Sequence, residues 1–322
     1  MELPLISVAI ATFNGEKYIH EQLISIFSQT YKNIEVIVCD DNSTDNTFSI
    51  LSEFKARQKL KLIKNKKNLG YIKNFEKALS LCNGEFIALS DQDDIWFSNK
   101  LEILLKNIGQ KSLIWSDCAI IDKKGAVISQ SFEKIRNLDL EANLDNKILF
   151  GSFILGCTVL FKKEVLKYAI PFPKSNPPHD WWICLVSSKI NGIKYLPIPL
   201  IKWRRHEMTD TTPSSFQFKS KYFRIIKFII FFKFSKDIVK FIKSIRKERK
   251  HYQYIYADLK SIELFNENDK KIIDELNIMF KSVNETRFKL RGFKILYKYR
   301  SLLFPEKNLL MMWGRLFLFC YS

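Results

Sequence analysis

The sequence predicts an α/β protein, with a mostly parallel sheet covered by helices on both faces and a C-terminal α-helical region. The first half of the 322 residues alternates short apolar, β-rich runs with helical patterns, which is typical of such a sheet. Beyond about Thr211 the composition changes to Lys, Arg, Phe, Ile and Tyr with little Gly or Pro, which indicates a run of helices. Hydrophobic residues make up 47% of the chain, which argues against intrinsic disorder.

Four strands and four helices are expected to alternate at the start of the chain. The predicted strands are the runs ISVAIAT from Ile6, IEVIVCD from Ile34, LKLIK from Leu60 and EFIALSD from Glu85. The predicted helices follow at about 16–28, 45–57, 71–82 and 98–107. Ligands of such sheets bind at the carboxyl ends of the strands, so the polar residues after each strand are candidates for a site.

Later segments continue this domain up to about residue 210. We expect a strand, a turn and a strand in LIWSDCAIIDKKGAVIS, further apolar segments in GSFILGCTVLF and PPHDWWICLVSSKI, and an extended run in LPIPLIKWRRHE. The sequence therefore divides into one domain over 1–210 and a helical region over 211–322.

The net charge of +18 is concentrated in the helical region. Residues 1–210 hold 28 Lys and Arg against 24 Asp and Glu, whereas residues 211–322 hold 24 against 10. One helix face is expected to carry the lysines that recur every three or four residues, namely Lys233, Lys236, Lys240, Lys243, Lys247 and Lys250. A basic amphipathic region fits an anionic partner, either nucleic acid or a membrane surface.

Cysteine spacing and hydropathy favour a cytoplasmic location. The six cysteines are scattered without metal-binding spacing, and we interpret them as reduced, small apolar residues. The N-terminal segment MELPLISVAIATFNG lacks a basic region and a small-residue cleavage site, so no export signal is expected. The most apolar later segment, over 225–234, contains two lysines and is too short to cross a bilayer.

Three aspartates, Asp91, Asp93 and Asp94, crowd the end of the fourth strand in ALSDQDDIWF. Their mutual repulsion requires a counter-ion, and a hard divalent cation such as Mg²⁺ or Mn²⁺ suits an oxygen-only site. Asp91 or Asp94 could instead cap the helix expected near Ser98, and Asp94 could hold a nearby basic side chain. For the cluster as a whole we favour a metal site.

A second acidic pair, Asp40 and Asp41, ends the second strand. A carboxylate only accepts hydrogen bonds, so Asp41 or Asp40 could accept one from the ring N–H of a uracil or thymine. An Asx-turn, with Ser43 or Thr44 capping the next helix, explains the same residues without a ligand.

Asn68, Gly70, Lys73 and Asn74 surround the start of the third helix. A basic side chain and free backbone N–H groups at a helix start favour a phosphate. A lone lysine in such a place is more often simply solvated.

Asp180 lies beside His179, Trp181 and Trp182 in the segment HDWW. Aromatic side chains can stack against a sugar, and desolvation raises a carboxylate's proton affinity, so this setting suits a general base. A structural role for Asp180 as a helix cap is the alternative.

His206, in KWRRHE, could bind a metal or a diphosphate together with Arg204 and Arg205. A lone histidine is more often structural. The position of these residues after the last extended run leaves both interpretations open.

These motifs, in this order, resemble those of the family-2 glycosyltransferases, and most closely the bacterial rhamnosyltransferase-like branch. The resemblance covers roughly residues 5–210 and rests on VAIATFNGEKYIHEQLISIFSQTYKNIEVIVCDDNSTDNT, NLGYIKNFEKAL, GEFIALSDQDDIWFSNKLE, HDWW and WRRH. It implies a Rossmann-like GT-A fold over 1–210 in which a UDP- or dTDP-sugar lies across the strand ends. The residues expected at the nucleotide-sugar are Thr12, Asn14, Glu16, Asp40, Asp41, Asn68, Gly70, Lys73, Asn74, Asp91, Gln92, Trp181 and Arg205.

The resemblance also implies a mechanism. Asp91 and Asp93 match the family's DxD motif, which makes Asp93 the direct ligand of Mn²⁺ or Mg²⁺, places Asp91 nearer the ribose and suggests His206 as a further ligand. Asp180 matches the base that deprotonates the acceptor hydroxyl, while the metal stabilises the departing diphosphate in a single inverting displacement. The sequence departs from the family pattern at His179, where glutamate often precedes the base, and at Ser98, where proline is frequent.

The basic helices suggest where the acceptor is found. A glycan built on a lipid carrier lies at the membrane surface, so we expect peripheral attachment to the inner face of the cell membrane. The same helices could instead pack on the catalytic domain or on a second subunit in a homo-oligomer.

Two other function classes are compatible with parts of the sequence. A sugar nucleotidylyltransferase would carry a Gly-rich, basic triphosphate loop after the first strand, but ATFNGEKY offers one Gly and one Lys. A nucleic-acid-binding protein would explain the basic region but not the acidic strand ends, because carboxylates repel phosphate. We therefore favour the glycosyltransferase and do not expect a nucleic-acid partner.

Overall fold

The computed structural model describes residues 3–57, 60–136, 147–151, 153–206, 250–259, 262–285 and 298. By its internal contacts the chain divides into two compact units. The first unit comprises Met1–Ile135, Asn143–Phe172 and Asn176–His206, and the second comprises Arg136–Ala142, Pro173–Ser175 and Glu207–Ser322. The long segment of the second unit begins at Glu207, and the domain boundary at residue 210 stays a prediction.

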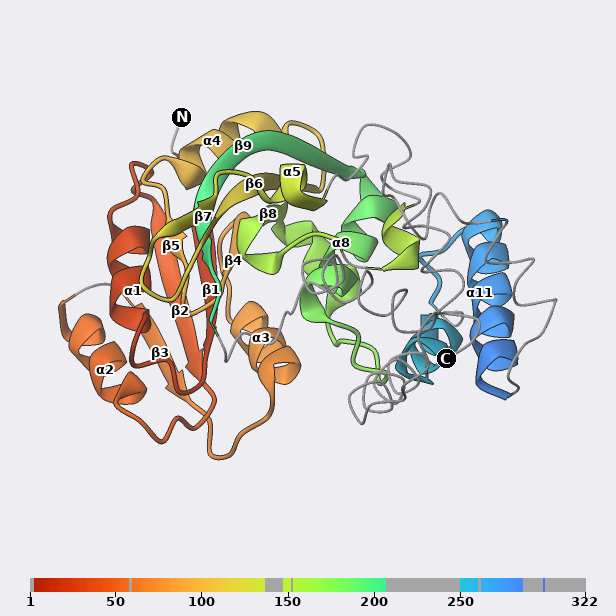
Figure 1. Cartoon of the computed structure of the whole chain (residues 1–322), viewed down its shortest axis with the longest axis horizontal. Helices are drawn as coiled ribbons and strands as arrows, with labels where there is room; N and C mark the ends of the chain where they lie inside the picture. The colour runs from red at the N-terminus through yellow and green to blue at the C-terminus, as the bar shows by residue number, and fades with distance from the viewer. Residues whose placement is uncertain are drawn as a thin grey trace, which may run out of the picture. The chain divides into compact units, whose positions relative to one another are not determined.

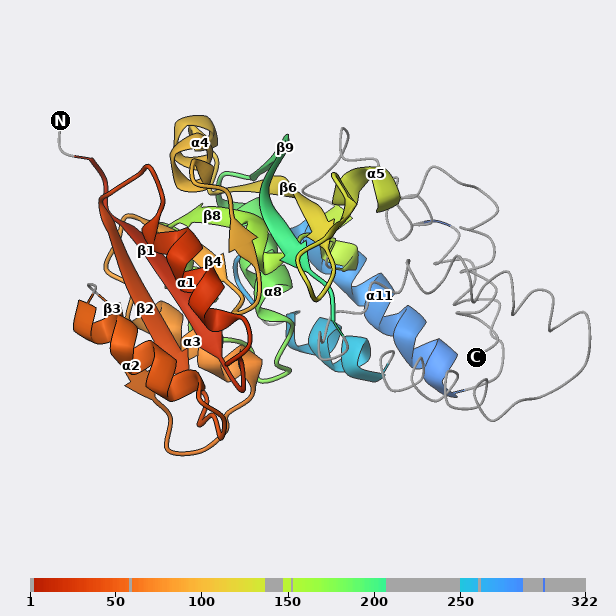
Figure 2. The same cartoon turned by 60° about the vertical axis from the view of Figure 1, so that its left-hand side comes forward.

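Within the described part of the chain, the first unit contains a nine-stranded sheet in the order β3-β2-β1-β4-β8-β6-β9-β5, with β7 paired to β6 (Figures 1 and 2). Its strands are β1 (Ile6–Thr12), β2 (Ile34–Asp40), β3 (Leu60–Lys64), β4 (Phe86–Ser90), β5 (Ile95–Trp96), β6 (Leu113–Ile121), β7 (Val127–Ser129), β8 (Val159–Lys162) and β9 (Ile193–Arg204).

The predicted parallel arrangement is confirmed for the first four strands, which pair in parallel as β3-β2-β1-β4. Beyond them the sheet is mixed, because β8 pairs antiparallel with both β4 and β6. The strands β6 and β9 are parallel to each other and run in the same direction as the first four. The short strand β5 is antiparallel to β9.

Helices cover both faces of this sheet (Figures 1 and 2). The main ones are α1 (Ile19–Phe27), α2 (Thr47–Arg57), α3 (Tyr71–Ser80), α4 (Lys100–Ile108) and α8 (His179–Ile190). α1, α2 and α4 share one apolar core with alternate residues of the strands, whereas α3 and α8 lie on the opposite face. Shorter segments are α5 (Phe132–Arg136), η1 (Ile148–Phe150), η2 (Gly156–Thr158), η3 (Lys163–Val165) and α7 (Leu166–Ala169).

The apolar runs form strands because their side chains are buried on both faces. Val8 and Ile10 of β1 enter the core shared with Leu23 of α1 and Leu104 of α4, and all four are fully buried. Burying each such side chain contributes roughly 1.5–3 kcal/mol to stability. The continuous core fixes the register, in which Thr12 lies opposite Asp40, so the loops after these strands meet at one edge of the sheet.

The described part of the second unit is helical, as predicted for the C-terminal region. A helix spans 250–259, and α11 spans Glu267–Glu285. Ser175, which belongs to this unit, donates to the Asp258 carboxylate from its backbone N at 3.0 Å and its hydroxyl at 2.8 Å. The lysine-rich face predicted from Lys233 onward lies outside the described residues except for Lys250, which is exposed.

Hydropathy along the described helices gives no candidate for a membrane-spanning segment, because none combines sufficient length with sufficient apolar character. Cys39, Cys82, Cys118, Cys157 and Cys184 are unpaired and buried. Their burial agrees with the interpretation that they are small apolar core residues. Cys320 lies outside the described residues.

Gly84 provides a test of the packing before β4. A Cβ at this position would lie 2.6 Å from the Ser7 backbone N and 2.7 Å from the Leu5 carbonyl oxygen. Backbone cannot move aside cheaply, so Gly84→Ala should lower the free energy of unfolding by about 1–3 kcal/mol. Urea denaturation followed by circular dichroism measures this, with the exposed Ser80→Ala as control, which should change stability by less than about 0.5 kcal/mol. Equal stability of the two variants would contradict the expected clash.

Candidate active site

Hydrogen bonds join the loop after β1 to the loop after β2. Asn14 adopts a left-handed backbone conformation with φ of 48°, and its N–H donates to the Ser43 hydroxyl at 3.0 Å. In return the Thr44 N–H donates to the Asn14 side-chain oxygen at 2.9 Å. The Glu16 carboxylate accepts from the backbone N of Asn46 at 2.9 Å. Asn14 and Glu16, both expected at the nucleotide-sugar, therefore organise the loops at the sheet edge, and their contact with a ligand stays a prediction.

The start of α2 is organised by Asp45 rather than by Ser43 or Thr44. The Asp45 carboxylate accepts from the backbone N of Thr47 at 3.0 Å. Burial alone would raise the pKa of Asp45, but hydrogen bonds from Thr47 and from the Glu16 backbone lower it overall.

Asp40 and Asp41 are both buried and already accept hydrogen bonds from the protein. Asp40 accepts from the Thr12 hydroxyl at 3.3 Å and from the Ser43 backbone N, three residues on, at 3.0 Å. Asp41 reaches across to the loop after β3, where the backbone N–H groups of Leu69 and Gly70 donate to it, each at 2.8 Å. A carboxylate has about four acceptor positions, so a contact between Asp41 and a base stays a prediction.

Asn65 joins Asp41 to α3 and is a residue that the sequence reasoning missed. Its amide N donates to Asp41 at 2.8 Å and to the Asn74 side-chain oxygen at 2.9 Å, while its oxygen accepts from Lys77 at 2.7 Å. Asn74 in turn donates to the Cys39 carbonyl oxygen at 2.7 Å. Asn74 is 1% exposed, so the structure gives it a role in holding this loop, whereas the sequence predicted a phosphate contact.

Asn68, Gly70 and Lys73 are placed at the start of α3, as expected. Gly70 has φ of 81°, a conformation that favours glycine, and its N–H also donates to the Asn68 side chain at 2.9 Å. Lys73 pairs with Glu76 at 2.6 Å, and its side chain is 43% exposed. Lys73 can therefore reach solvent, and its predicted phosphate contact stays untested.

Gln92 fastens the loop after β1 to the acidic loop over 91–94, which follows β4. Its side-chain oxygen accepts from the Phe13 N–H at 2.9 Å, and its amide N donates to the Phe13 carbonyl at 3.0 Å. A Cβ on Gly15 would lie 2.3 Å from the Gln92 side-chain oxygen, so a larger residue there would displace the Gln92 amide from Phe13. Gln92 thus joins the two loops through both the oxygen and the nitrogen of its side-chain amide.

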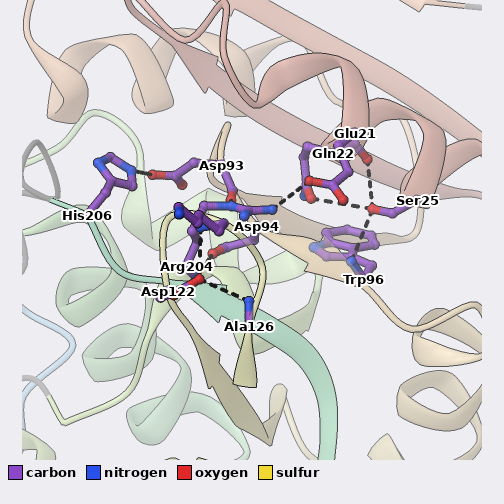
Figure 3. A network of polar contacts seen from close by, with 11 residues as sticks. Glu21, Gln22, Ser25, Asp93, Asp94, Trp96, Asp122, Ala126, Arg204 and His206 are labelled. Atoms are coloured by element: carbon purple, nitrogen blue, oxygen red, sulfur yellow. Dashed lines mark hydrogen bonds and ion pairs between the residues drawn. The ribbon is translucent and has the colours of Figure 1, made fainter. Parts of the chain in front are cut away.

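The acidic loop places Asp93 and Asp94 in different surroundings (Figure 3). The Asp93 carboxylate contacts His206 Nε2 at 2.7 Å, which brings together two residues predicted to share a metal. Asp94 is 1% exposed, and its Oδ1 accepts from the Arg204 backbone N at 3.0 Å. α4 begins after Asn99, which supplies no side-chain cap, so neither Asp91 nor Asp94 has the capping role considered from the sequence.

The carboxylates of this loop are strongly coupled. Burial, together with the charges of Asp93 and Asp180, raises the pKa of Asp91 to about 7. Burial also raises the pKa of Asp94, with the charges of Asp93 and Asp91 adding to the effect. Among the described residues, Oδ2 of Asp94 has no nitrogen or oxygen donor, although the Cys157 thiol, a weak donor, interacts with both Asp91 and Asp94. The loop therefore carries more negative charge than its hydrogen bonds satisfy.

Lys100 is a basic residue buried beside these acids. It is fully buried, its Nζ donates to the Cys157 carbonyl at 2.6 Å, and the same atom lies 3.4 Å from the centroid of the Trp96 ring. Burial lowers the pKa of Lys100 to about 7, although Asp94 and Asp91 act in the opposite direction. The sequence reasoning missed Lys100, because a lysine in an amphipathic helix ordinarily faces solvent.

Asp180 lies in the first turn of α8, next to the acidic loop. Its Oδ1 accepts from the Trp181 backbone N at 2.7 Å, and the N-cap position is taken by Pro178, so Asp180 is not the helix cap. A Cβ on Gly156 would lie 3.1 Å from Asp180 Cβ and 3.2 Å from His179 Nε2. Gly156 therefore allows η2 to pack closely against the start of α8.

His179 occupies the position where glutamate often precedes the base in the family. Its ring stacks on Phe75 with a centroid distance of 3.9 Å, and both ring nitrogens are buried without a hydrogen-bond partner within the described part of the chain. Burial lowers the pKa of His179, which favours the neutral imidazole.

The tryptophans beside Asp180 belong to the core, which corrects the expectation that this aromatic setting faces a sugar. Trp181 and Trp182 are 1% and 2% exposed. Their indole N–H groups donate to the carbonyls of Ile148 at 2.6 Å and Ala169 at 2.8 Å. Trp181 therefore has no open face for the predicted stacking, because HDWW is the start of a buried helix.

Arg205 lies near the acidic loop, as its predicted role requires. Its guanidinium carbon is 4.5 Å from the centroid of the Trp203 ring. Burial lowers the pKa of Arg205, although the charge of Asp93 acts in the opposite direction. Whether Arg205 contacts a nucleotide-sugar stays a prediction.

Sequence comparisons place the chain among glycosyltransferases. The family model described as Glycosyl transferase family 2 matches residues 7–168. An uncharacterized glycosyltransferase of Haemophilus influenzae is 31% identical over 213 residues, which is 63% of this chain and 66% of the relative. The UDP-Glc:alpha-D-GlcNAc-diphosphoundecaprenol beta-1,3-glucosyltransferase WfgD of Escherichia coli is 31% identical over 59% of this chain and 73% of its own length. The dTDP-rhamnosyl transferase RfbG of Shigella flexneri is 30% identical over 67% of this chain and 78% of its own length.

Solved structures support the fold. Staphylococcus aureus TarS 1–349, in complex with UDP-GlcNAc, has a TM-score of 0.59 at 18% identity, covering 94% of this chain and 82% of that one. The mannosyltransferase PcManGT of Pyrobaculum calidifontis, in complex with GDP-Man and Mn²⁺, has a TM-score of 0.55 at 16% identity, covering 98% and 86%. At these identities the likeness shows the fold, and the predicted GT-A fold is confirmed. The family match over residues 7–168 and the 30% identity over two thirds of the chain show that this protein is a glycosyltransferase of family 2.

Proposed function

We propose that this protein transfers a sugar from a UDP- or dTDP-sugar to a hydroxyl of a lipid-linked glycan, during assembly of a bacterial surface polysaccharide. The observation that carries the proposal is the convergence of Asp91, Asp93 and Asp180 at the carboxyl edge of the sheet. Two relatives support the substrate classes, because their names specify a UDP-glucose donor with a diphosphoundecaprenol-linked acceptor, and a dTDP-rhamnosyl donor. The transferred sugar itself is left open between these possibilities.

The donor atoms of the acidic loop fit a hard divalent cation such as Mn²⁺ or Mg²⁺. Burial and crowding raise the pKa of Asp91, and Asp94 has an oxygen without an N–H or O–H donor in the described structure, so the loop lacks positive charge. Asp93 and His206 are in direct contact, with side chains 15% and 12% exposed, and would hold the ion together with Asp91. When bound, a divalent cation stabilises the negative charge that develops on the departing nucleotide diphosphate.

A second set of possible ligands is less suitable. Ligand atoms of Asp91, Asp94 and Cys157 lie within 4.8 Å of one another. This set is next to the buried Lys100, whose Nζ bonds the Cys157 carbonyl. Because a cation already lies beside it and a thiol is a soft ligand, we favour Asp93 for a hard cation.

Asp180 would act as the general base. It would take the proton from the acceptor hydroxyl as that oxygen attacks the anomeric carbon, and a single displacement of this kind inverts the configuration. It lies in the first turn of α8. The buried Trp181 and Trp182 hold this turn in place.

The donor nucleotide would lie over the loops after β1, β2 and β3. Asp41 is our proposal for the acceptor of the base N–H, and the surrounding donors Asn65, Leu69 and Gly70 fix its orientation. The partly exposed Lys73 would lie toward the phosphates. This assignment does not discriminate uracil from thymine, because both rings present the same N–H.

The first test measures donor use and the role of Asp180. Purified protein is titrated with a panel of UDP- and dTDP-sugars in Mn²⁺ or Mg²⁺ while hydrolysis and transfer to a lipid-linked acceptor are followed. We expect Asp180→Asn to abolish transfer and to leave donor binding within about twofold of wild type, because a general base contributes mainly to the transition state. Glu53→Gln, on an exposed position of α2, is the control and should remain active. Full turnover by Asp180→Asn would remove this residue from the mechanism.

Asp93→Ala tests the metal site. We expect the variant to lose metal-dependent donor use, with an apparent metal affinity at least tenfold weaker, because a direct ligand is missing. Isothermal titration with Mn²⁺ in the presence of UDP measures this. An unchanged Mn²⁺ affinity would move the site away from Asp93 and favour the set that contains Cys157.

The location of the acceptor motivates a further prediction for the second unit. We propose peripheral attachment to an anionic membrane surface, because residues 211–322 hold 24 Lys and Arg against 10 Asp and Glu. Each basic residue near such a surface contributes roughly 1 kcal/mol. The full chain should float with anionic liposomes at low salt and not with neutral ones. Failure to bind anionic vesicles would favour packing of this region on the protein or on a second subunit.

A further inference from the structure

The end of β9 makes direct contacts with two consecutive acids of the acidic loop. Arg204 donates from its backbone N to Asp94 Oδ1 at 3.0 Å and from its Nε to the Asp93 carbonyl oxygen at 2.8 Å. His206 Nε2 contacts the Asp93 carboxylate at 2.7 Å. The main chain and the side chain of Asp93 are thus both held by one strand end, as Figure 3 shows.

Arg204 is itself anchored on α1. Its side chain is 3% exposed and forms an ion pair with Glu21 at 2.6 Å. Its guanidinium carbon lies 4.8 Å from the centroid of the Tyr18 ring, and the same ring stacks on His206 at 5.0 Å. The start of α1 therefore fixes both of the residues that contact Asp93.

The same helix also holds the acidic loop from the other side. In the amide orientation that satisfies both its ends, Gln22 donates to the Asp94 carbonyl and accepts from Ser90 and Trp96. The Ser25 hydroxyl accepts from the Trp96 backbone N at 3.0 Å. The acidic loop is consequently enclosed between α1 and the end of β9.

The guanidinium of Arg204 therefore donates its hydrogen bonds to partners inside the protein. One interpretation of the sequence was that Arg204 binds a diphosphate together with Arg205 and His206, but its Nε and Nη2 donate to Asp93 and Glu21. An arginine suits this place because its planar group donates in two directions at once, which a lysine ammonium on a flexible stem does not reproduce.

We infer that Arg204 is a positioning residue, which joins α1 to the acidic loop and thereby holds Asp93 in the orientation needed to bind the divalent cation. The inference rests on the proposed function for the identity of the ion and on the contacts above for the role of Arg204. Repulsion among Asp91, Asp93 and Asp94 tends to open the loop, and the Arg204 contacts oppose this opening.

The sign of the effect on metal binding separates positioning from simple electrostatics. A guanidinium near a divalent cation repels it, so removal of the charge alone should strengthen metal binding. Loss of positioning should weaken it, by about tenfold or more, as for other groups that orient metal ligands.

The experiment uses the full chain with Mn²⁺ as the probe and electron paramagnetic resonance to measure the free ion. We expect Arg204→Ala and Arg204→Lys to raise the Mn²⁺ dissociation constant at least tenfold and Glu21→Gln to raise it less, because glutamine keeps an acceptor for Arg204. Lys202→Ala, which removes a cation two residues earlier on β9, is the matched control and should bind Mn²⁺ like wild type.

Amide hydrogen exchange supplies a readout that needs neither metal nor activity. In Arg204→Ala, amides over 91–96 should exchange at least tenfold faster, while those of β2 should be unchanged. Unchanged or tighter Mn²⁺ binding in both Arg204 variants would overturn the inference.

If wild type itself binds no Mn²⁺, the metal part of the proposed function fails, and exchange alone decides. Faster exchange over 91–96 then supports the link between α1 and the loop, and unchanged exchange refutes it. If Arg204→Ala does not fold, Arg204→Lys and Glu21→Gln decide by the same two readouts.

Discussion

The candidate active site, at the carboxyl edge of the sheet, depends on holding several carboxylates together where they are largely buried. Asp91, Asp93 and Asp94 lie within four consecutive positions with Asp180 close by, and burial together with this crowding raises the pKa of Asp91 to about 7. Two basic side chains of the protein, Lys100 and Arg204, lie beside these acids. One oxygen of Asp94 has neither an N–H nor an O–H donor among the described residues. The remaining negative charge makes this edge suited to a divalent cation, and a diphosphate would bind there only through such a cation.

The sequence predicted the parallel half of the sheet well. β1 and β2 begin where predicted, at Ile6 and Ile34, because each is a run of mostly buried apolar residues. β3 also begins where predicted, at Leu60, although it lies at the edge of the sheet and only its first residue is buried. The same logic correctly placed the acidic and amide clusters at one edge, since parallel strands share the direction of their carboxyl ends. The predicted helix starts were less exact. α1 begins at Ile19 rather than near residue 16, because its N-cap residue makes no side-chain capping bond and so leaves no capping signal in the sequence.

What the sequence did not reveal are contacts between distant residues. Arg204 pairs with Glu21 across 183 positions, and Lys100 reaches the Cys157 carbonyl across 57, so no local pattern links either pair. Composition was misleading at Trp181, where an aromatic segment beside an acid suggested a sugar platform and the helix instead buries its indole. Each of these residues packs beside or bonds to residues of the predicted site, and these contacts form only when the chain folds.

The central claim is that Asp93 holds a divalent cation beside the donor diphosphate. Anomalous X-ray scattering from crystals grown with Mn²⁺ and UDP tests it most directly, because the signal locates the ion without reference to activity. The account predicts a manganese peak in bonding contact with the Asp93 carboxylate and the diphosphate, with His206 or Asp91 adjacent. A peak bound by Asp91, Asp94 and Cys157 without Asp93, or an ordered UDP with no ion beside it, would contradict the account.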